Sequence, residues 1–338
     1  MGMPINLAVV GCGDIAGYMA RVSRLVAAVR LAACCDVHPA RAETFARRHR
    51  IPGVYSDYQK MLAQNDAIDA VYLAVPHHLH RSMILEAVER GLPVLVEKPL
   101  TRTLEEGLRL VEILHSKGSR VGVNYQYRYD RGCYALARAV QNGELGKVHS
   151  VRINIPWHRE PAYFDSAAWH KTVAEAGGGT LITQGSHFLD IALWALGEKP
   201  LAAFGAAATP GFDVEVETLA HGIIETEGGT LISIVSSMVA AREGAVSIEL
   251  YGQRGTAIYA NRPYPHVRFE GVSPRRERPP VWGVHALQRS LAGFARWVLQ
   301  DSPYLIPAAE ALPALAAVET VYRSAQSGLR EEIKITRH

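Results

Sequence analysis

The chain has 338 residues, of which 48% are hydrophobic and 20% are charged, and its formal net charge is +3. This composition is typical of a soluble globular protein, and the length predicts two domains rather than one. The weak, mixed charge argues against a nucleic-acid surface, and no apolar run approaches the roughly 18 residues that a membrane span needs. An apolar strand follows Met1 almost at once, so we expect no signal peptide and a cytoplasmic protein.

The four cysteines, Cys12, Cys34, Cys35 and Cys133, include no C-x-x-C pair. Two of them are adjacent within an apolar segment, where small buried thiols are common. We therefore interpret all four as reduced packing residues and expect neither a disulfide nor a zinc site from them.

A glycine-rich turn follows the first predicted strand, residues 5–10, and a helical pattern then runs to about Val26. The turn has the form G-x-G-x-x-A, in which the first glycine permits a tight turn and the second lets a pyrophosphate approach the backbone. The small Ala16 lets helix and strand pack closely, and the helix N-terminus faces the phosphates. The pattern predicts a dinucleotide site that includes Gly11, Gly13, Asp14 and Ile15.

The next predicted strand, residues 31–35, ends in Asp36, 20 residues after Ala16. An acid at this position binds both ribose hydroxyls of NAD and repels the 2′-phosphate of NADP. Asp36 therefore predicts NAD as the cofactor, although the nearby Arg41 could soften that preference.

Strands and helices alternate regularly up to Asn124. Further strands are predicted at residues 54–55, 67–75, 92–96 and 120–124, and helices at residues 39–50, 82–89 and 104–117. Such alternation predicts a doubly wound parallel sheet, that is, a Rossmann domain over residues 1–124.

The segment after the strand at 67–75 reads Pro76-His77-His78-Leu79-His80. A zinc ion would need further ligands from elsewhere, and this spacing offers it no advantage. We expect no metal site. We expect Pro76, His77 and His80 to lie against the cofactor, because ligands bind at the carboxyl ends of parallel strands.

The apolar run from Leu92 to Val96 stops abruptly at Glu97-Lys98-Pro99. The run predicts a buried parallel strand, and proline cannot continue a central strand. Lys98 at the strand's carboxyl end is therefore a candidate for chemistry. The alternative is a solvated lysine, and Glu97 could either orient Lys98 or simply end the strand.

The alternation stops after Asn124, at the aromatic and polar segment 125–129, where we place the domain boundary. The second domain, residues 125–338, is predicted to contain a helix to about 141, a strand at 148–155, and helices at 180–196, 285–299 and 308–327. Several strands with glycine turns between 201 and about 270 predict a largely antiparallel sheet.

Three consecutive glycines, residues 177–179, precede the predicted helix at 180–196. Gln184 and His187 are three residues apart on that helix, hence on one face. His187 is therefore either a hydrogen-bonded core residue or part of a site.

Together these motifs are similar to those of the Gfo/Idh/MocA family of nicotinamide-dependent sugar and polyol oxidoreductases. The resemblance rests on the glycine turn, Glu97-Lys98-Pro99, and the triple glycine followed by His187 and Asp190, and it covers nearly the whole chain. It implies a Rossmann domain followed by an α/β domain whose large, open, mostly antiparallel sheet forms a dimer or tetramer contact. It also implies that Glu97, Lys98 and Gln126 bind the cofactor.

Lys98 and His187 are the expected catalytic residues, and we expect both to face one cavity. A free lysine has a pKa of about 10.4, but burial beside a positively charged nicotinamide would lower it toward a useful range. The amine would then exchange a proton with the reacting hydroxyl or carbonyl oxygen. The resemblance gives His187 a similar role, but Thr183 stands where many members have an aspartate, so Lys98 is the stronger candidate.

The segment 157–171 resembles the substrate loop of members that act on sugar acids or nucleotide sugars. Aromatic faces suit sugar rings, and an arginine can pair a carboxylate or phosphate with two hydrogen bonds. The alternative is a packed interdomain loop. The expected substrate-binding residues are Lys98, Arg128, Trp157, Arg159, Tyr163, Trp169, Gln184 and His187.

The sequence thus predicts an NAD-dependent oxidoreductase that transfers hydride to or from a sugar, sugar acid, nucleotide sugar or cyclitol. Two alternatives stay open: a glycosidase of the same family that uses transient oxidation, and a non-catalytic NADH-binding protein. The expected partners are a small carbohydrate-like substrate and further copies of this chain in a homodimer or homotetramer, with neither nucleic acid nor a membrane.

Overall fold

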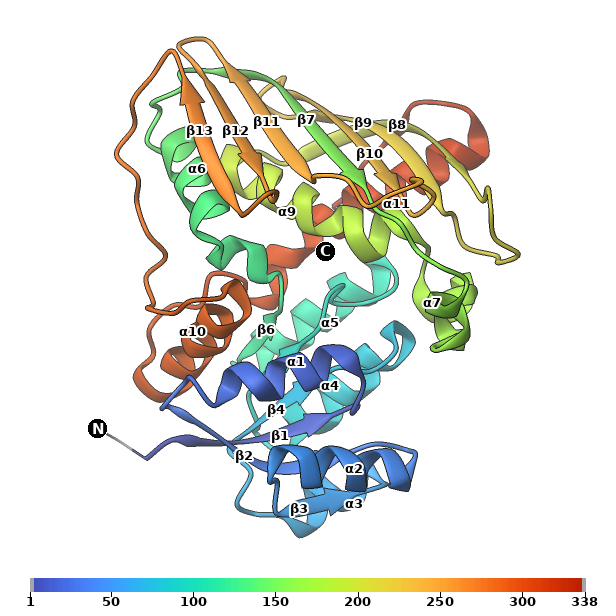
Figure 1. The fold of residues 1–338 in the computed structure, drawn as a ribbon, viewed down its shortest axis with the longest axis vertical. Coiled ribbons are helices and arrows are strands. Elements are labelled where there is room, and N and C mark those ends of the chain that lie inside the picture. Colours follow the sequence, from blue (N-terminus) through green and yellow to red (C-terminus); the bar gives the residue numbers. More distant parts are fainter. Residues whose placement is uncertain (1–2, 336–338) are drawn as a thin grey trace. The chain divides into compact units, whose positions relative to one another are not determined.

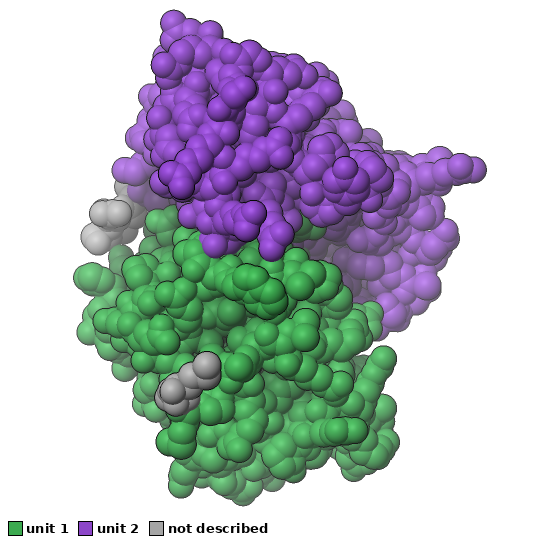
Figure 2. Space-filling view, turned by 60° about the vertical axis from the view of Figure 1, so that its left-hand side comes forward, with its two compact units in different colours: residues 1–101, 105–129, 280–310 green, residues 102–104, 130–279, 311–338 purple. Residues whose placement is uncertain are grey.

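The computed structural model describes residues 3–335, which form two compact units (Figures 1 and 2). Unit 1 contains residues 3–101, 105–129 and 280–310, and unit 2 contains residues 102–104, 130–279 and 311–335. The chain leaves unit 1 a few residues after the expected boundary at Asn124. Residues 280–310, which the sequence analysis placed in the second domain, return to unit 1.

Unit 1 is built on a six-stranded parallel sheet. Its strands are β1 (Ile5–Val10), β2 (Val29–Cys35), β3 (Gly53–Tyr55), β4 (Ala70–Leu73), β5 (Val94–Val96) and β6 (Val121–Val123). Their order is β3-β2-β1-β4-β5-β6, so the direction of strand addition reverses between β1 and β4. Most residues of the central strands are buried, as expected for a parallel sheet covered on both faces. The predicted Rossmann fold is therefore confirmed.

The connections between these strands are mainly helical. They are α1 (Asp14–Ser23), α2 (Pro39–His49), α3 (Tyr58–Gln64), α4 (His80–Glu89) and α5 (Leu104–Ser116), with the short turn η1 (His77–Leu79) before α4. After β6 come η2 (Gln126–Tyr129) and, in the segment that returns to unit 1, α10 (Ala286–Gln300) and η5 (Ala308–Ala311). Helix α3 was not predicted. It begins where the Asp57 side chain accepts a hydrogen bond from Lys60 N, an ordinary N-cap.

Helix α10 explains why residues 280–310 belong to unit 1. It packs on η2 and on α1. Its buried Arg289 donates hydrogen bonds to Tyr129 O and to Gly283 O. Further along, the ring of Tyr304 stacks on the rings of Tyr129 and Trp297. Residues 280–310 therefore contribute buried side chains to the core of unit 1.

Unit 2 contains an eight-stranded open sheet. Its strands are β7 (Val148–Pro156), β8 (Pro200–Ala208), β9 (Leu219–Thr226), β10 (Leu231–Ser237), β11 (Ser247–Gly252), β12 (Thr256–Ala260), β13 (His266–Glu270) and β14 (Glu331–Glu332). The order is β13-β12-β11-β7-β10-β9-β8-β14. Strand β10 runs parallel to β7, and the other neighbours are antiparallel. The predicted mostly antiparallel sheet is confirmed.

Helices cover one face of this sheet, as Figure 1 shows for α6, α9 and α11. The helices of unit 2 are α6 (Arg131–Gln141), α7 (Ala162–Asp165), α8 (Val173–Ala176), α9 (Ser186–Leu196) and α11 (Leu312–Ser327), with η3 (Ala168–Lys171) and η4 (Leu181–Gly185). The segment η4 is a π-helix, so the predicted helix at 180–196 begins with a wider turn. None of the helices within residues 3–335 is long and apolar enough to cross a membrane.

Candidate functional site

The predicted cofactor residues of unit 1 lie at one edge of its sheet. Gly11 directly follows β1, Asp36 follows β2, and Glu97 and Lys98 follow β5. Because parallel strands end at the same edge, the folding of three separate segments places these residues on one side of the sheet. This edge, at the reversal between β1 and β4, is where sheets of this kind bind ligands.

The turn after β1 is shaped for close approach of a phosphate. Gly11 has a φ of +82°, and a Cβ at this position would overlap Ala74 O. Gly13 is the N-cap of α1, where no side chain caps the first N–H groups. Asp14 and Ile15 are exposed in the same first turn. An uncapped helix N-terminus beside a glycine turn fits the pyrophosphate of a dinucleotide.

Asp36 is buried, and the backbone fixes its carboxylate. One oxygen accepts a hydrogen bond from Cys12 N at 2.9 Å and the other from His38 N at 2.9 Å. Arg41 Nη1 lies 3.5 Å from the carboxylate, and the Arg41 side chain is half exposed. A carboxylate held this way suits a ribose diol, while Arg41 adds a positive charge that partly offsets repulsion of a 2′-phosphate.

We expect Asp36→Ser to shift the preference for NADH over NADPH by roughly ten- to a hundredfold, because two charge-assisted hydrogen bonds to the ribose are lost. Arg41 would then have no carboxylate competing with a 2′-phosphate. Fluorescence titration of both reduced cofactors measures the ratio of dissociation constants. Asp57→Ser, which removes a carboxylate from a helix cap of the same unit, is the matched control. An unchanged ratio in the Asp36 variant would contradict this assignment.

His77 and His80 are both buried, with ring centroids 5.5 Å apart. The two ring nitrogens of His80 lie 2.8 Å from Pro99 O and 3.0 Å from Val75 O. Burial lowers the pKa of His80 to about 4, so the ring is neutral and donates only one of these bonds. The His80 ring joins the end of β4 to the segment that follows Lys98, and its predicted contact with the cofactor stays a prediction.

Glu97 does more than end its strand. Its carboxylate is buried, and one oxygen accepts hydrogen bonds from Tyr72 OH at 2.6 Å and from Asn124 Nδ2 at 2.6 Å. Burial raises the pKa of Glu97, whereas the two hydrogen-bond donors and the positive charge of Lys98 lower it. Of the two roles left open by the sequence, a positioning role has the support of this geometry.

Lys98 is partly buried at the carboxyl end of β5. Burial lowers the pKa of its amine, and the negative charge of Glu97 opposes this change. An amine with a lowered pKa spends more time neutral near pH 7, which is the state a general base requires.

The predicted residues of unit 2 lie on η4 and on the start of α9. Thr183 and Gln184 are buried in the π-helix, and His187 is buried one turn later. The Thr183 hydroxyl donates to Gly179 O at 2.6 Å, and Gln184 Oε1 accepts from the Thr180 hydroxyl at 2.7 Å. Single turns of π-helix often occur at functional sites, because they turn side chains out of the regular register.

A buried carboxylate fixes the start of this helix. Glu217 accepts hydrogen bonds from Gly179 N at 2.6 Å, Leu181 N at 2.8 Å and Tyr322 OH at 2.8 Å. The triple glycine makes room for this arrangement. A Cβ at 178 would overlap the Tyr322 hydroxyl, and one at Gly179 would overlap Glu217 O. Sequence reasoning missed Glu217, although an acid shortly before β9 was visible.

The aromatic loop expected to bind substrate is assembled within unit 2. The Arg159 guanidinium lies over the rings of Trp157 and Tyr163, at 4.7 and 5.4 Å from their centroids. His170 stacks on Tyr163 and on Trp169, with centroids 4.6 and 3.7 Å apart. Burial raises the pKa of Tyr163 to about 12, and its hydroxyl also interacts with Thr183. The loop is thereby joined to the π-helix.

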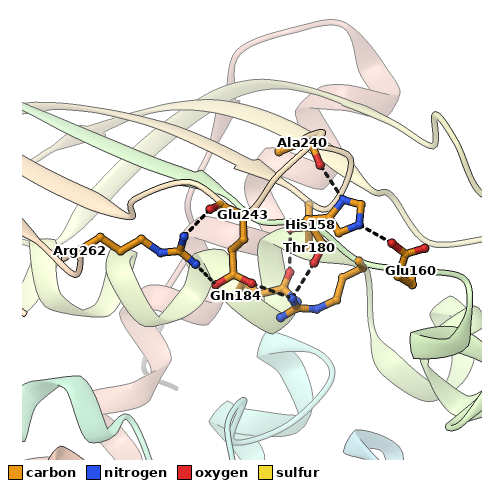
Figure 3. A network of polar contacts seen from close by, with 8 residues as sticks. His158, Glu160, Thr180, Gln184, Ala240, Glu243 and Arg262 are labelled. Atoms are coloured by element: carbon orange, nitrogen blue, oxygen red, sulfur yellow. Dashed lines mark hydrogen bonds and ion pairs between the residues drawn. The ribbon is translucent and has the colours of Figure 1, made fainter. Parts of the chain in front are cut away.

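Figure 3 shows the charged side of this loop, where Glu243 lies beside Arg262 and His158 beside Glu160. Glu243 also pairs with Arg159, at 3.7 Å. Arg159 is thus held from two sides, by aromatic faces and by a carboxylate. Its side chain is only 24% exposed, so its cationic head is presented in one orientation.

Arg128 was expected to meet the substrate, and its contacts in the structure are with the protein itself. It is 3% exposed, and its guanidinium donates to Leu305 O at 3.0 Å and to the Glu310 carboxylate at 3.1 Å. Its partners come from the returning segment of unit 1, so Arg128 fastens that segment to η2. Gln126, an expected cofactor residue, is partly buried at the start of the same turn.

Metal ligands do not gather in the described part of the chain, residues 3–335, where no three His, Cys, Asp or Glu side chains are placed to hold an ion. All four cysteines are buried free thiols.

A parallel doubly wound sheet with this glycine turn and this acid defines a dinucleotide-binding protein. Family models match both parts of the chain: the NAD-binding Rossmann fold of the oxidoreductase family over residues 5–125, and the Gfo/Idh/MocA C-terminal domain over residues 134–258. The chain belongs to the Gfo/Idh/MocA family of oxidoreductases.

Relatives with assigned names extend this comparison. The chain is 30% identical over 286 residues to inositol 2-dehydrogenase 2 of Saccharopolyspora erythraea, covering 81% of this chain and 78% of the relative. It is 29% identical over 310 residues to dTDP-3,4-didehydro-2,6-dideoxy-α-D-glucose 3-reductase of Saccharopolyspora spinosa, covering 88% of each.

Solved structures share the fold. The WlbA dehydrogenase of Bordetella pertussis, crystallised with NADH and UDP-GlcNAcA, matches with a TM-score of 0.88 at 24% identity, over 98% of this chain and 100% of that one. At this identity the likeness establishes the fold of both units and nothing about the ligand.

Proposed function

We propose that this protein is an NAD-dependent dehydrogenase or reductase that acts on a hydroxyl or carbonyl carbon of a sugar, sugar acid, nucleotide sugar or cyclitol. The observation that carries the proposal is Lys98, at the carboxyl end of β5 in a sheet whose same edge holds Gly11 and Asp36. The names of the relatives, an inositol dehydrogenase and a deoxysugar reductase, support a carbohydrate-like substrate.

Lys98 is proposed to move the proton. Bound NAD supplies the acceptor of hydride, and its reduced form supplies the donor. In the oxidative direction the neutral amine of Lys98 takes the hydroxyl proton from the substrate. In the reductive direction its ammonium donates a proton to the carbonyl oxygen as negative charge develops there. His187 of unit 2 is proposed as a second polar group for the substrate, with a smaller role because the neighbouring Thr183 has no charge to stabilise an imidazolium.

The aromatic loop of unit 2 is proposed to bind the sugar. Trp157, Tyr163 and Trp169 offer ring faces, and Gln184 an amide. Arg159 is the proposed partner of a substrate carboxylate or phosphate, because its guanidinium is already oriented by stacking.

We expect Arg159→Gln to raise KM for acidic or phosphorylated sugars by roughly ten- to a hundredfold, since a charge-assisted hydrogen bond contributes about 1.5–3 kcal/mol. KM for neutral cyclitols should change little. Arg152→Gln, on an exposed position of β7, is the matched control for loss of a positive charge. Equal changes for neutral and acidic substrates would count against an anion-binding role.

The function itself is tested by following NADH formation with the full-length protein over sugars, sugar acids, inositols and nucleotide sugars. A substrate that reduces NAD stoichiometrically supports a dehydrogenase. Hydrolysis of a glycoside without net NADH formation would favour the glycosidase alternative. NADH binding with no turnover of any compound, in either direction, would favour a cofactor-binding protein without catalysis.

The uncovered face of the unit 2 sheet is the proposed contact between copies of the chain. Phe204 and Ile223 are cross-strand partners on this face, and both are about half exposed, as is Leu231. An exposed apolar patch of this kind is typical of a subunit contact.

We expect Phe204→Glu to produce monomers in sedimentation velocity. Arg268→Glu, on β13 at the opposite edge of the sheet, should not. A wild-type monomer would refute the contact.

A further inference from the structure

We propose that Asn124 and Ser290 are positioning residues for Lys98: they hold the Glu97 carboxylate beside it through a chain of buried hydrogen bonds that begins on helix α10. This inference rests on the proposed function only in giving Lys98 a chemical role. The coupling between the groups is a property of unit 1 and can be measured without a substrate.

The chain of contacts is continuous and lies inside unit 1. Asn124 directly follows β6, and its amide Nδ2 donates to Glu97 Oε1 at 2.6 Å. The Ser290 hydroxyl, on α10, donates to Asn124 Oδ1 at 2.8 Å. Asn124 and Ser290 are completely buried, and Glu97 is 8% exposed. Buried polar side chains joined this closely fix one another's orientation.

The Ser290 hydroxyl donates its one proton to Asn124 Oδ1. The Tyr304 hydroxyl lies 2.8 Å from Ser290 Oγ and 3.3 Å from Val123 O, and both oxygens can accept its proton. The bond from Ser290 favours the orientation in which the Asn124 NH₂ group points toward Glu97. Without the Ser290 hydroxyl the Asn124 amide could rotate by about 180° and point its oxygen at the Glu97 carboxylate. Two oxygens that both carry negative charge would then repel one another.

The chain also connects parts of the sequence that no local pattern links. Ser290 and Asn124 are 166 residues apart. Gly122 makes room for the arrangement, because a Cβ there would come within 2.7 Å of the Tyr304 ring. The returning segment 280–310 therefore reaches the strand end next to Lys98, in addition to packing on η2.

The charged and titratable groups around the pair are few. Tyr72 on β4 and Tyr304 both face Glu97, and the pKa of each is raised well above 10. His80 on α4 faces Lys98 and is neutral, because burial lowers its pKa to about 4. Glu97 and Lys98 act on one another: the positive charge of Lys98 lowers the pKa of Glu97, and the negative charge of Glu97 raises the pKa of Lys98.

The expected result follows from the sign of this interaction. Asn124→Ala removes a donor that favours the charged carboxylate, so the pKa of Glu97 rises and its negative charge beside Lys98 is weakened. The pKa of Lys98 then falls, by about one unit for a lost interaction of about 1.4 kcal/mol. Ser290→Ala should lower the pKa of Lys98 as well, by a smaller amount.

The same change should appear in the kinetics. In the oxidative direction the acid limb of the profile of kcat against pH would move to lower pH, and kcat would fall roughly tenfold as Lys98 loses its orientation.

The test is competitive acetylation of Lys98 with acetic anhydride as a function of pH, read by peptide mass spectrometry on the full-length protein. Ser290→Thr, which keeps the hydroxyl, should retain the wild-type pKa. Ser23→Ala, which removes another buried hydroxyl of unit 1, one that donates to Ala20 O, should also retain the wild-type pKa. These controls separate positioning from a general loss of stability.

An unchanged Lys98 pKa in folded Asn124→Ala and Ser290→Ala would overturn the inference. If Asn124→Ala fails to fold, Ser290→Ala, which deletes a single oxygen, decides alone. The outcomes also separate the two proposals. Full activity without the Lys98 amine would reject the proposed mechanism and leave this coupling intact, whereas normal dependence on Lys98 with no pKa shift would reject only the coupling.

Discussion

Lys98→Met is expected to lower kcat by roughly a hundredfold to ten-thousandfold, the usual range for loss of a positioned general acid or base. Methionine keeps an unbranched stem of similar length, so the packing at the end of β5 should survive. NADH should still bind, because Gly11, Gly13 and Asp36 are untouched. Steady-state kinetics on the substrate found by screening, together with NADH titration, measure the two effects separately.

The matched control is Lys117→Met, which removes a cation from the exposed end of α5 in the same unit. His187→Gln provides a second comparison and is expected to reduce kcat less, because Thr183 supplies no carboxylate to stabilise an imidazolium. A Lys98→Met enzyme that turns over near the wild-type rate would remove the basis of the proposed mechanism.

Gly179→Ala is expected to destabilise the fold by about 3 kcal/mol or more, because the added Cβ would overlap the Glu217 backbone oxygen and force the chain apart. The displacement would also lengthen the hydrogen bonds that Gly179 N and Leu181 N donate to the Glu217 carboxylate. Urea unfolding monitored by fluorescence gives the change in the free energy of unfolding. Since typical proteins are stable by only about 5–15 kcal/mol, such a change is large.

Gly17→Ala is the matched control for this substitution. Gly17 lies inside α1, and a Cβ there meets no atom within 4 Å. Alanine in a helix interior is favoured over glycine by about 1 kcal/mol, so this variant should be neutral or slightly more stable. If Gly179→Ala unfolded at the wild-type urea concentration, the close approach of Glu217 to the triple glycine would not exist in solution.

Local patterns were sufficient to predict the strand ends of unit 1. The G-x-G turn and Asp36 depend on neighbours within one strand–turn–helix unit, and the apolar run before Lys98 has the length and abrupt end of a buried strand. The same reasoning missed α3, in which only Met61 and Leu62 are buried. A short helix with two core residues leaves too weak a periodicity to recognise.

Contacts between distant segments could not be predicted from the sequence. Glu217 reaches Gly179 across 38 residues, and Ser290 reaches Asn124 across 166. The π-helical turn at Leu181–Gly185 was predicted as α-helix, since one widened turn barely changes the spacing of apolar residues. The contact of Arg128 with Glu310 could not be predicted either, because an arginine side chain suits an anion equally well, whether that anion is a ligand or the protein's own Glu310.

The return of residues 280–310 to unit 1 has a consequence for how the protein is made. Ribosomes deliver the first 129 residues long before Ser290 and Tyr304, so the nucleotide-binding half cannot finish folding while most of the other half is still unsynthesised. A gene fragment that stops at Tyr129 would encode a sheet without its last core residues. An isolated version of this half would instead require a short linker from residue 129 directly to residue 280.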